Sequence, residues 1–452
     1  MTDSMILVTG VYPVGGHLAG WRHPTAYPDI AMNLDAMIEL ARLAERGRIQ
    51  ALFLADGNAV RQMDKPALFE AVAPSDRPAS FEPTTVMAAI AQHTAHVGLF
   101  ATATTTYEQP YLLARKFASL DHISGGRAIW NVVTGSYPGD AVNFGGGFPE
   151  RTDRYRRAGE FLDVCKGLWD SWADDAFPQD KASGRFLDSS RVHVLDHVGE
   201  NFAVRGPLNV ARSPQGHPVL FMAGQSGPGR DLAAQHADCL FTVAQTKEES
   251  LAAVADIKGR VAAFGRDPAA LKIIPGIRVN VAGSREQALD LYRELNALVS
   301  PALGVEYLSS QVKQDLSGYP LDGPMPDLST EVAGVTSIRQ SIGEMAAREG
   351  LTVRQTYQRL LAADEDPPFT GTAAEVADEM EDWFRSGACD GFMMNVPTLP
   401  LGLERVVDLL VPELQRRGLF HDDYTGGTLR EELRLPVLRN AYFDTAHAGS
   451  TT

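Results

Sequence analysis

The chain has 452 residues, of which 44% are hydrophobic and 22% charged, with 41 glycines and 27 prolines. This composition is typical of a globular protein and excludes a disordered or fibrous chain. The excess of 57 acidic over 41 basic residues gives a formal net charge of −16, which repels a phosphate backbone and an anionic membrane surface, so we expect no nucleic acid and no membrane among the partners.

Cysteine usage and the amino terminus point to the cell interior. Cys165, Cys239 and Cys389 are far apart and form no CxxC pair, which argues against a disulfide framework and a zinc cluster. Residues 1–10 lack the basic and apolar regions of a signal peptide, and no run approaches the roughly 20 apolar residues of a membrane span. We therefore expect a soluble, cytoplasmic protein.

Eight short apolar runs bounded by glycine, proline or polar clusters predict strands that are buried on both faces. They are Met5–Val11, Ala51–Ala55, Val97–Ala103, Arg127–Val133, Val219–Ala223, Cys239–Val243, Ile273–Val281 and Gly391–Val396. Segments with helical periodicity lie between them and after the last one. They are Leu34–Ala44, Thr84–Thr94, Gln109–His122, Tyr155–Trp172, Arg230–His236, Lys247–Phe264, Arg285–Ala297, Ala373–Arg385 and Leu403–Arg417.

Eight strands that alternate with helices predict an α/β fold of the (β/α)8 TIM-barrel type. The alternative, an open doubly wound sheet, predicts a GxGxxG fingerprint in the first turn, and the sequence contains none. We place insertions at about 174–216, after strand 4, and 301–368, before strand 8, and expect both to be lids or pocket walls. The barrel then spans residues 1–420, and 421–452 form a polar C-terminal extension.

Polar residues at the carboxyl ends of the strands are the candidate site, because barrel enzymes place their chemistry there. Asp56 ends the second strand, although an aspartate there can also cap a turn. Thr102 ends the third, where β-branched residues are common in any case. Asn131 lies within the apolar fourth strand, as a satisfied core amide or as a ligand contact.

The glycine-rich stretch 224–229 follows a strand and opens a helix, which suits an anion such as phosphate. His17, in the first loop, can be a solvated or core histidine, or a donor or base at the top face. No paired carboxylates, Ser/His/Asp set or metal cluster stands out, so we predict no metal site. A site with donors, apolar walls and few acids or bases is typical of an enzyme whose cofactor supplies the chemistry.

Motifs along nearly the whole chain resemble one family. They are WRHP at 21–24, FLAD at 53–56, ATATTTY at 101–107, ARKFASLDHISGGR at 114–127, WNVVT at 130–134, AGQS at 223–226, AQHAD at 234–238, DLSGYPLD at 315–322, VADEMEDWF at 376–384, GACDGF at 387–392 and VPELQRRGLF at 411–420. Their combination resembles the bacterial-luciferase-like flavin-dependent monooxygenases, in the branch of the nitrilotriacetate, dibenzothiophene-sulfone and long-chain-alkane monooxygenases.

The resemblance implies a two-component monooxygenase. Such an enzyme binds reduced FMN at the top of the barrel, reacts with O2 to form a flavin peroxide or hydroperoxide, and oxygenates a small organic substrate, in some members with C–S or C–N cleavage. A separate NAD(P)H:flavin reductase supplies the reduced flavin, and a homodimer or homotetramer is expected. Water must be kept from the peroxide, so we predict that the segment 301–368 is a lid.

The resemblance also assigns site residues by motif position. Asp56 and Thr102 resemble contacts to the isoalloxazine end, and Asn131 lines the same cavity. Tyr155 and Ser226 resemble phosphate contacts. Arg151 stands where relatives usually have histidine, and we predict that its guanidinium pairs with the FMN phosphate.

His17 resembles a pocket histidine near the reactive edge of the flavin, and we predict that it orients the peroxide or substrate as a catalytic residue, with a role as acid or base left open. Two other functions stay open at this point. One is a metal-dependent TIM-barrel hydrolase, and the other is a flavin-binding protein without chemistry of its own.

Overall fold

A computed structural model describes residues 4–12, 14–64, 66–224, 226–244, 246–328, 337–363 and 367–443. Gln225 of the glycine-rich stretch, 329–336 and 364–366 of the predicted lid, and 444–452 of the predicted extension lie outside the described residues. In the described part of the chain, no helix is both long and apolar enough to cross a membrane.

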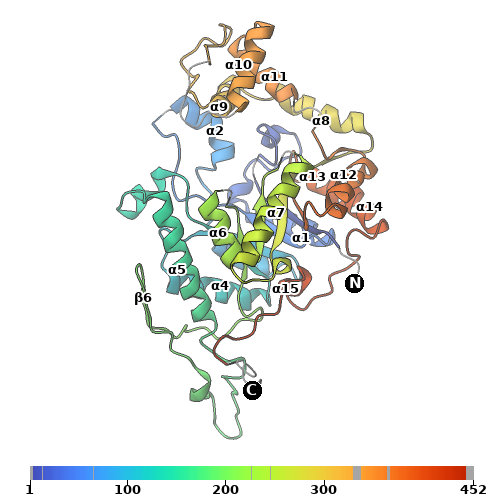
Figure 1. The fold of residues 1–452 in the computed structure, drawn as a ribbon. Coiled ribbons are helices and arrows are strands. Elements are labelled where there is room, and N and C mark those ends of the chain that lie inside the picture. Colours follow the sequence, from blue (N-terminus) through green and yellow to red (C-terminus); the bar gives the residue numbers. More distant parts are fainter. Residues whose placement is uncertain are drawn as a thin grey trace.

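Eight parallel strands close into a barrel in the order β1-β12-β9-β8-β7-β4-β3-β2, which confirms the predicted TIM-barrel fold. The strands are β1 Ile6–Gly10, β2 Ala51–Leu54, β3 Gly98–Thr104, β4 Ala128–Val133, β7 Val219–Met222, β8 Cys239–Thr242, β9 Lys272–Arg278 and β12 Gly391–Asn395. All eight coincide with the predicted runs to within a few residues. Figure 1 shows helices surrounding this barrel.

Alternate strand residues point inward, as a two-residue repeat requires. Phe53, Phe100 and Phe221 meet in the barrel interior, with ring centroids 4.6 Å apart for the first pair and 4.5 Å for the second. The intervening residues pack against the surrounding helices in a second, larger cluster. The interior is therefore a filled core, and a ligand has to bind above it, at the carboxyl ends of the strands.

The surrounding helices agree with the periodic segments. They are α1 Leu34–Arg46, α3 Pro83–Ala91, α4 Pro110–Ser124, α5 Arg151–Trp169, α6 Gly227–His236, α7 Lys247–Ala263, α12 Ala373–Arg385, α13 Leu401–Arg405 and α14 Val411–Arg416. A π-helical turn, Val406–Leu410, joins the last two and precedes Pro412, which has no N–H to donate to a regular helix.

The insertion before the last strand begins earlier than predicted. A short parallel pair, β10 Asn280–Val281 and β11 Thr370–Gly371, brackets α8 Arg285–Ala297, α9 Pro301–Val312, α10 Ser337–Glu349 and α11 Val353–Ala363. The helix expected over 285–297 exists, but it belongs to this excursion, and α12 leads into the last barrel strand. Figure 1 shows α8 to α11 together above the barrel.

A further helix was not predicted. After β2 the chain runs through α2 Pro66–Asp76 before it reaches α3, and α2 packs against α9 of the later insertion. The short apolar run in this segment contains Pro74 and has no clear helical stripe, so its sequence gave no signal of a buried helix. The top of the barrel is thus covered by two insertions.

The predicted lid role of 174–216 is wrong. This segment follows α5 and precedes β7, so it leaves the barrel at the amino ends of the strands. It carries a short 3-10 helix, Ser189–Arg191, and the small hairpin β5 His197–Val198 and β6 Ala203–Val204. Arg212 donates to the carbonyl of Leu438, and Asn440 donates to that of Trp172, both at 2.8 Å. Figure 1 shows this arm pointing away from α2 and α9.

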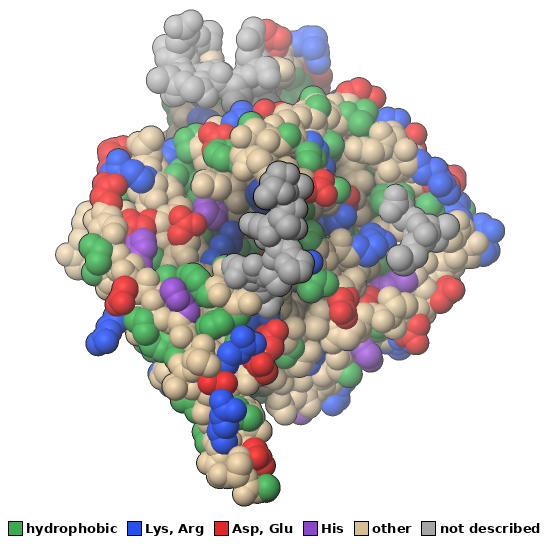
Figure 2. All heavy atoms as spheres, turned by 60° about the horizontal axis from the view of Figure 1, so that its bottom comes forward, with side chains coloured by type: hydrophobic (Ala, Val, Ile, Leu, Met, Phe, Trp, Pro, Cys, Tyr) green, Lys and Arg blue, Asp and Glu red, His purple; other side chains and the backbone are tan. Residues whose placement is uncertain are grey.

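The segment after Leu419 closes the bottom of the barrel. Leu429 and Leu433, on and just after α15 Leu429–Glu432, are buried in the same cluster as the inward strand residues. Arg430 is 3% exposed and makes two hydrogen bonds, of 3.0 and 2.9 Å, with the carboxylate of Asp238. Figure 2, which brings this end forward, shows acidic and basic side chains interspersed, so the net negative charge does not gather into one patch here.

Candidate active site

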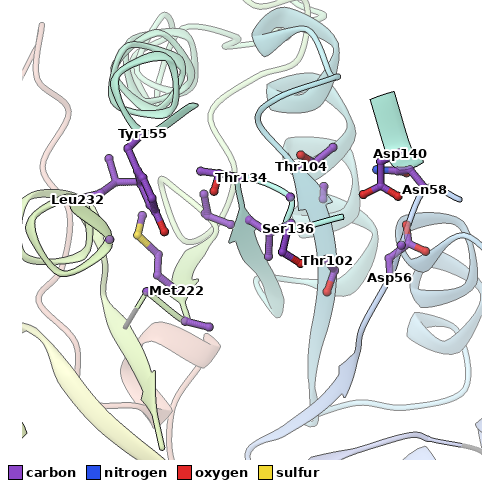
Figure 3. Close-up of a pocket in the computed structure, with 18 of the residues that line it drawn as sticks. Asp56, Asn58, Thr102, Thr104, Thr134, Ser136, Asp140, Tyr155, Met222 and Leu232 are labelled. Atoms are coloured by element: carbon purple, nitrogen blue, oxygen red, sulfur yellow. The ribbon is translucent and has the colours of Figure 1, made fainter. Parts of the chain in front are cut away.

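A cavity of about 250 Å³ lies at the carboxyl ends of β2, β3, β4 and β7. Its lining combines the ends of four strands, the segments that follow β2 and β4, and residues of the first two turns of α5 and α6: Asp56, Gly57, Asn58, Arg61, Thr102, Ala103, Thr104, Val132, Val133, Thr134, Gly135, Ser136, Asp140, Tyr155, Met222, Ala223, Gly224, Gly229 and Leu232. In Figure 3, Asp56, Asn58 and Asp140 lie on one side, and Tyr155, Met222 and Leu232 on the other.

One side of the cavity is acidic. Asp56 follows β2 directly, and Asp140 comes from a short helix after β4, Pro138–Phe144. Burial raises the pKa of both carboxyl groups, and the negative charge of Asp140 adds to the rise at Asp56. Asp140 is 5% exposed, and its Oδ1 has no hydrogen-bond partner among the described residues. This side therefore presents acceptors to a ligand.

Thr102 and Asn131 form a fixed pair between adjacent strands. The Thr102 hydroxyl donates to the carbonyl of Leu54 at 2.9 Å and accepts from the side-chain amide of Asn131, also at 2.9 Å. Both side chains are buried, and Thr102 lines the cavity whereas Asn131 stands behind it. Because its proton is already engaged, the Thr102 hydroxyl can offer a ligand only an acceptor lone pair.

The opposite side brings two hydroxyl groups to the start of a helix. Tyr155 lies in the second turn of α5, and Ser226 caps α6, where its Oγ accepts from the Gly229 amide at 3.2 Å. The two hydroxyl oxygens are 3.5 Å apart. A Cβ at Gly229 would lie 2.9 Å from the Tyr155 hydroxyl, so glycine is what permits this approach. Helix amides and two hydroxyls form a site suited to an anion.

Four predicted residues are absent from the cavity lining: Asn131 and Ser226, described above, and Arg151 and His17. Arg151 is exposed in the first turn of α5, four residues before Tyr155. His17 is 9% exposed, and its Nε2 is 3.0 Å from Oδ1 of Asn296 on α8. Its neighbour Leu18 lines a second cavity, between α2 and α9.

Sequence reasoning missed part of the lining. Asn58 and Arg61 lie in the segment that carries α2, and Asp140 follows the fourth strand by seven residues, beyond the strand ends that we considered. Met222 and Leu232 read as core residues of β7 and α6. Asn58 and Asp140 are polar residues in the loops that follow strand ends. A search of these loops for polar residues could have identified the acidic side of the cavity.

The described residues give no indication of a metal site. Within the residues placed by the structure, no group of three or more His, Cys, Asp and Glu side chains is arranged to hold a metal ion. His236 and Asp238 have a spacing found in some iron sites, but they lie at the bottom of the barrel, where Asp238 binds Arg430.

The chain is similar to known oxygenases over nearly its full length. A family model described as luciferase-like monooxygenase matches residues 14–390. The chain is 45% identical over 431 residues to N-acetyl-S-(2-succino)cysteine monooxygenase of Bacillus subtilis (strain 168), covering 95% of this chain and 96% of the relative. It is 44% identical over 434 residues to nitrilotriacetate monooxygenase component A of Aminobacter aminovorans, covering 94% and 95%.

A solved structure links the fold to a flavin. A crystal structure of riboflavin lyase with modified FMN and riboflavin superimposes with a TM-score of 0.79 at 30% identity, over 96% of this chain and 97% of the other. These similarities confirm the predicted resemblance. Because the family consists of monooxygenases, they also argue against the alternative of a metal-dependent hydrolase. The chain belongs to the luciferase-like monooxygenase family, whose members are flavin-dependent enzymes.

Proposed function

We propose that this protein is the oxygenase component of a two-component system. It takes reduced FMN from a separate NAD(P)H:flavin reductase and uses O2 to oxygenate a small organic substrate, with or without cleavage of a C–S or C–N bond. The observation that carries the proposal is the cavity above the filled barrel, which has acceptors on one side and an anion site on the other. The word "component" in the name of the nitrilotriacetate relative supports a partner protein.

The residues of the cavity suit a flavin. Val132, Met222 and Leu232 provide apolar contacts for an aromatic ring system, as small-molecule sites usually do. The unpartnered Oδ1 of Asp140 is a buried acceptor that a ligand N–H would satisfy. Bound reduced FMN supplies the two electrons for the activation of O2, and the protein binds it, orients it and excludes water.

Acceptors on the acidic side favour the reduced form of the cofactor. Asp56 offers carboxylate oxygens, and Thr102 offers only a lone pair because its proton is bonded to Leu54. A reduced isoalloxazine has more N–H donors than an oxidised one, so it satisfies more of these groups. Asn131 acts by holding Thr102 in place.

The flavin phosphate fits the opposite side. Tyr155 and Ser226 are the proposed phosphate contacts, at the start of α6. Arg151, one turn before Tyr155, is exposed and can swing its guanidinium toward a phosphate that sits there. For His17 we propose a positioning role, because it ties the first loop to α8 beside the second cavity.

The substrate class follows from the similar oxygenases. The names of two relatives specify a thioether and a tertiary amine, which supports oxidation next to sulfur or nitrogen here.

The three cysteines are free and buried, in keeping with a reducing cytoplasm. Assembly as a homodimer or homotetramer stays a prediction.

The test is anaerobic titration with photoreduced FMN, followed by turnover with a flavin reductase, NADH and O2 and a mass-spectrometric screen of thioethers and tertiary amines. We expect saturable binding of reduced FMN that is tighter than binding of oxidised FMN, and a product that gains one oxygen or loses a C–S or C–N bond. Absence of binding contradicts the proposal. Binding with only hydrogen peroxide as product, over the whole screen, would favour a flavin-binding protein without chemistry of its own.

A further inference from the structure

A second cavity, of about 340 Å³, lies between the two insertions that cover the barrel. Its lining comes from the first loop, the α2 segment, the loop after β4 and α9: Leu18, Arg61, Gln62, Val72, Ser75, Asp76, Tyr137, Leu303, Glu306, Tyr307 and Ser310. Arg61 also lines the proposed flavin cavity, so the two cavities are neighbours. A substrate bound in the second cavity would therefore lie next to the proposed flavin cavity.

Arg61 is the only cationic side chain among the described residues that line either cavity. Its guanidinium lies 5.0 Å from the centre of the Tyr137 ring, which holds it in place through a cation–π contact. In the part of the chain that the structure describes, none of its N–H groups has a hydrogen-bond acceptor, and it forms no ion pair. Asp140 attracts it electrostatically without a hydrogen bond. A half-buried guanidinium fork in this state suits a carboxylate.

Asp76 is the complementary charge in the same cavity. It ends α2, where the carbonyl end of the helix disfavours an anion and favours a cation beside it. Over the described ranges it has neither a hydrogen bond nor an ion pair, and it is not bonded to Arg61. The neighbouring Arg77 attracts Asp76, but its guanidinium donates to the carbonyl of Ala55 at 2.8 Å and lies over the Tyr12 ring.

Arg61 and Asp76 carry opposite charges in the same cavity but are not bonded to each other. The pair therefore suits a ligand that carries both a negative and a positive charge. We infer that the second cavity binds the amino-acid end of an S-substituted amino acid, with its carboxylate on Arg61 and its ammonium group on Asp76. The substituted sulfur then points toward the flavin cavity. This inference rests on the proposed function and narrows its substrate.

The test is isothermal titration calorimetry of the full-length protein, with FMN in excess, against S-methyl-, S-allyl- and S-benzyl-L-cysteine. Each probe is compared with its methyl ester, which removes the carboxylate charge, and with its N-acetyl form, which removes the ammonium charge. We expect at least one parent probe to bind, and each masked form to bind about tenfold or more weakly, as loss of a charged hydrogen bond predicts.

Two variants assign the charges. Arg61→Gln should bind the acid and the ester equally, while it still distinguishes the free from the acetylated amine. Asp76→Asn should show the reverse pattern. Arg205→Gln, on the exposed arm with a side chain that is 85% exposed, is the charge-matched control and should behave as wild type.

Three outcomes overturn the inference. The first is that no parent probe binds the wild-type protein, and the second is that the masked and parent forms bind alike. The third is that Arg61→Gln weakens the binding of FMN and leaves that of riboflavin unchanged, which would show that Arg61 binds the flavin phosphate. A separate titration with reduced FMN alone tests the proposed function. If the wild-type protein binds FMN but none of the probes, only the inference about the second cavity is contradicted. If the protein does not bind FMN, the proposed function itself is contradicted.

Discussion

The amide of Asn131 donates a hydrogen bond of 2.9 Å to the hydroxyl oxygen of Thr102, and both side chains are buried at the end of adjacent strands. The same hydroxyl donates to the carbonyl of Leu54 on the other neighbouring strand. One threonine thus links three strands of the barrel and turns a lone pair toward the cavity.

Thr102→Val removes this link with almost no change of shape. The buried amide of Asn131 then loses its acceptor, which should lower the free energy of unfolding by about 1–3 kcal/mol. Reduced FMN should also bind more weakly, because one acceptor of the cavity is lost. Urea unfolding and anaerobic titration measure the two effects. Thr102→Ser keeps the hydroxyl and should stay close to wild type, and a valine variant with wild-type values in both assays contradicts this role.

Asp56 should make flavin binding depend on pH. Burial raises the pKa of its carboxyl group, so protonation begins at a higher pH than for an exposed aspartate. Protonation removes acceptor capacity, and the affinity for reduced FMN should therefore fall as the pH falls through this raised pKa. Asp56→Asn should bind about tenfold more weakly at neutral pH and lose most of the pH dependence. Asp408→Asn, in an exposed ion pair with Arg46, is the control.

The phosphate contacts can be separated from the ring contacts by the choice of ligand. Tyr155→Phe removes one hydroxyl from the anion site, and Arg151→Ala removes a nearby positive charge. Each should weaken the binding of FMN about five- to tenfold and leave that of riboflavin, which has no phosphate, unchanged. Fluorescence quenching measures both affinities. Equal losses for FMN and riboflavin would assign the residue to the ring, and an Arg151→Ala protein with wild-type affinity would remove Arg151 from the site.

The tautomer of His17 follows from its neighbours. Its Nδ1 accepts from the amide of Ala19 at 3.1 Å, so the proton of the neutral ring sits on Nε2 and points to Asn296. His17→Gln should raise KM two- to tenfold, as loss of about one hydrogen bond predicts, with a smaller effect on kcat. Asn296→Ala should do the same. Loss of one limb of the pH profile in the glutamine variant would instead show acid or base catalysis.

The barrel could be predicted because each strand is a separate apolar run with a clear boundary. Asp56 and Thr102 were found because they end such runs. Arg61 and Asp140 were not, because they lie in loops whose path depends on packing against distant segments, as when α2 meets α9. The burial of Leu429 and Leu433 was also missed, since two leucines among charged residues give too short a pattern to distinguish a plug from a surface turn.

His236, at the bottom of the barrel, should make the protein sensitive to acid. The ring is 5% exposed, and its Nδ1 lies 3.2 Å from the ammonium group of Lys166. Burial, together with the positive charges of Lys166 and Arg266, lowers the pKa of His236 to about 3. The folded protein therefore keeps this ring neutral at pH values at which the unfolded chain, with an ordinary pKa of about 6.5, already binds a proton.

The sign follows from proton counting. Between pH 6.5 and about 3 the unfolded state holds more protons than the folded state, so the free energy of unfolding falls as the pH falls, by a few kcal/mol over the window. Above pH 6.5 both states hold a neutral ring and the contribution is constant. His236→Gln keeps an acceptor for Lys166 but cannot titrate, so its stability should decline less steeply between pH 6.5 and 4. Urea unfolding at half-unit pH steps measures the slopes. His96→Gln, at an exposed histidine, should keep the wild-type slope, and equal slopes for wild type and His236→Gln would show that the buried ring takes up its proton without cost.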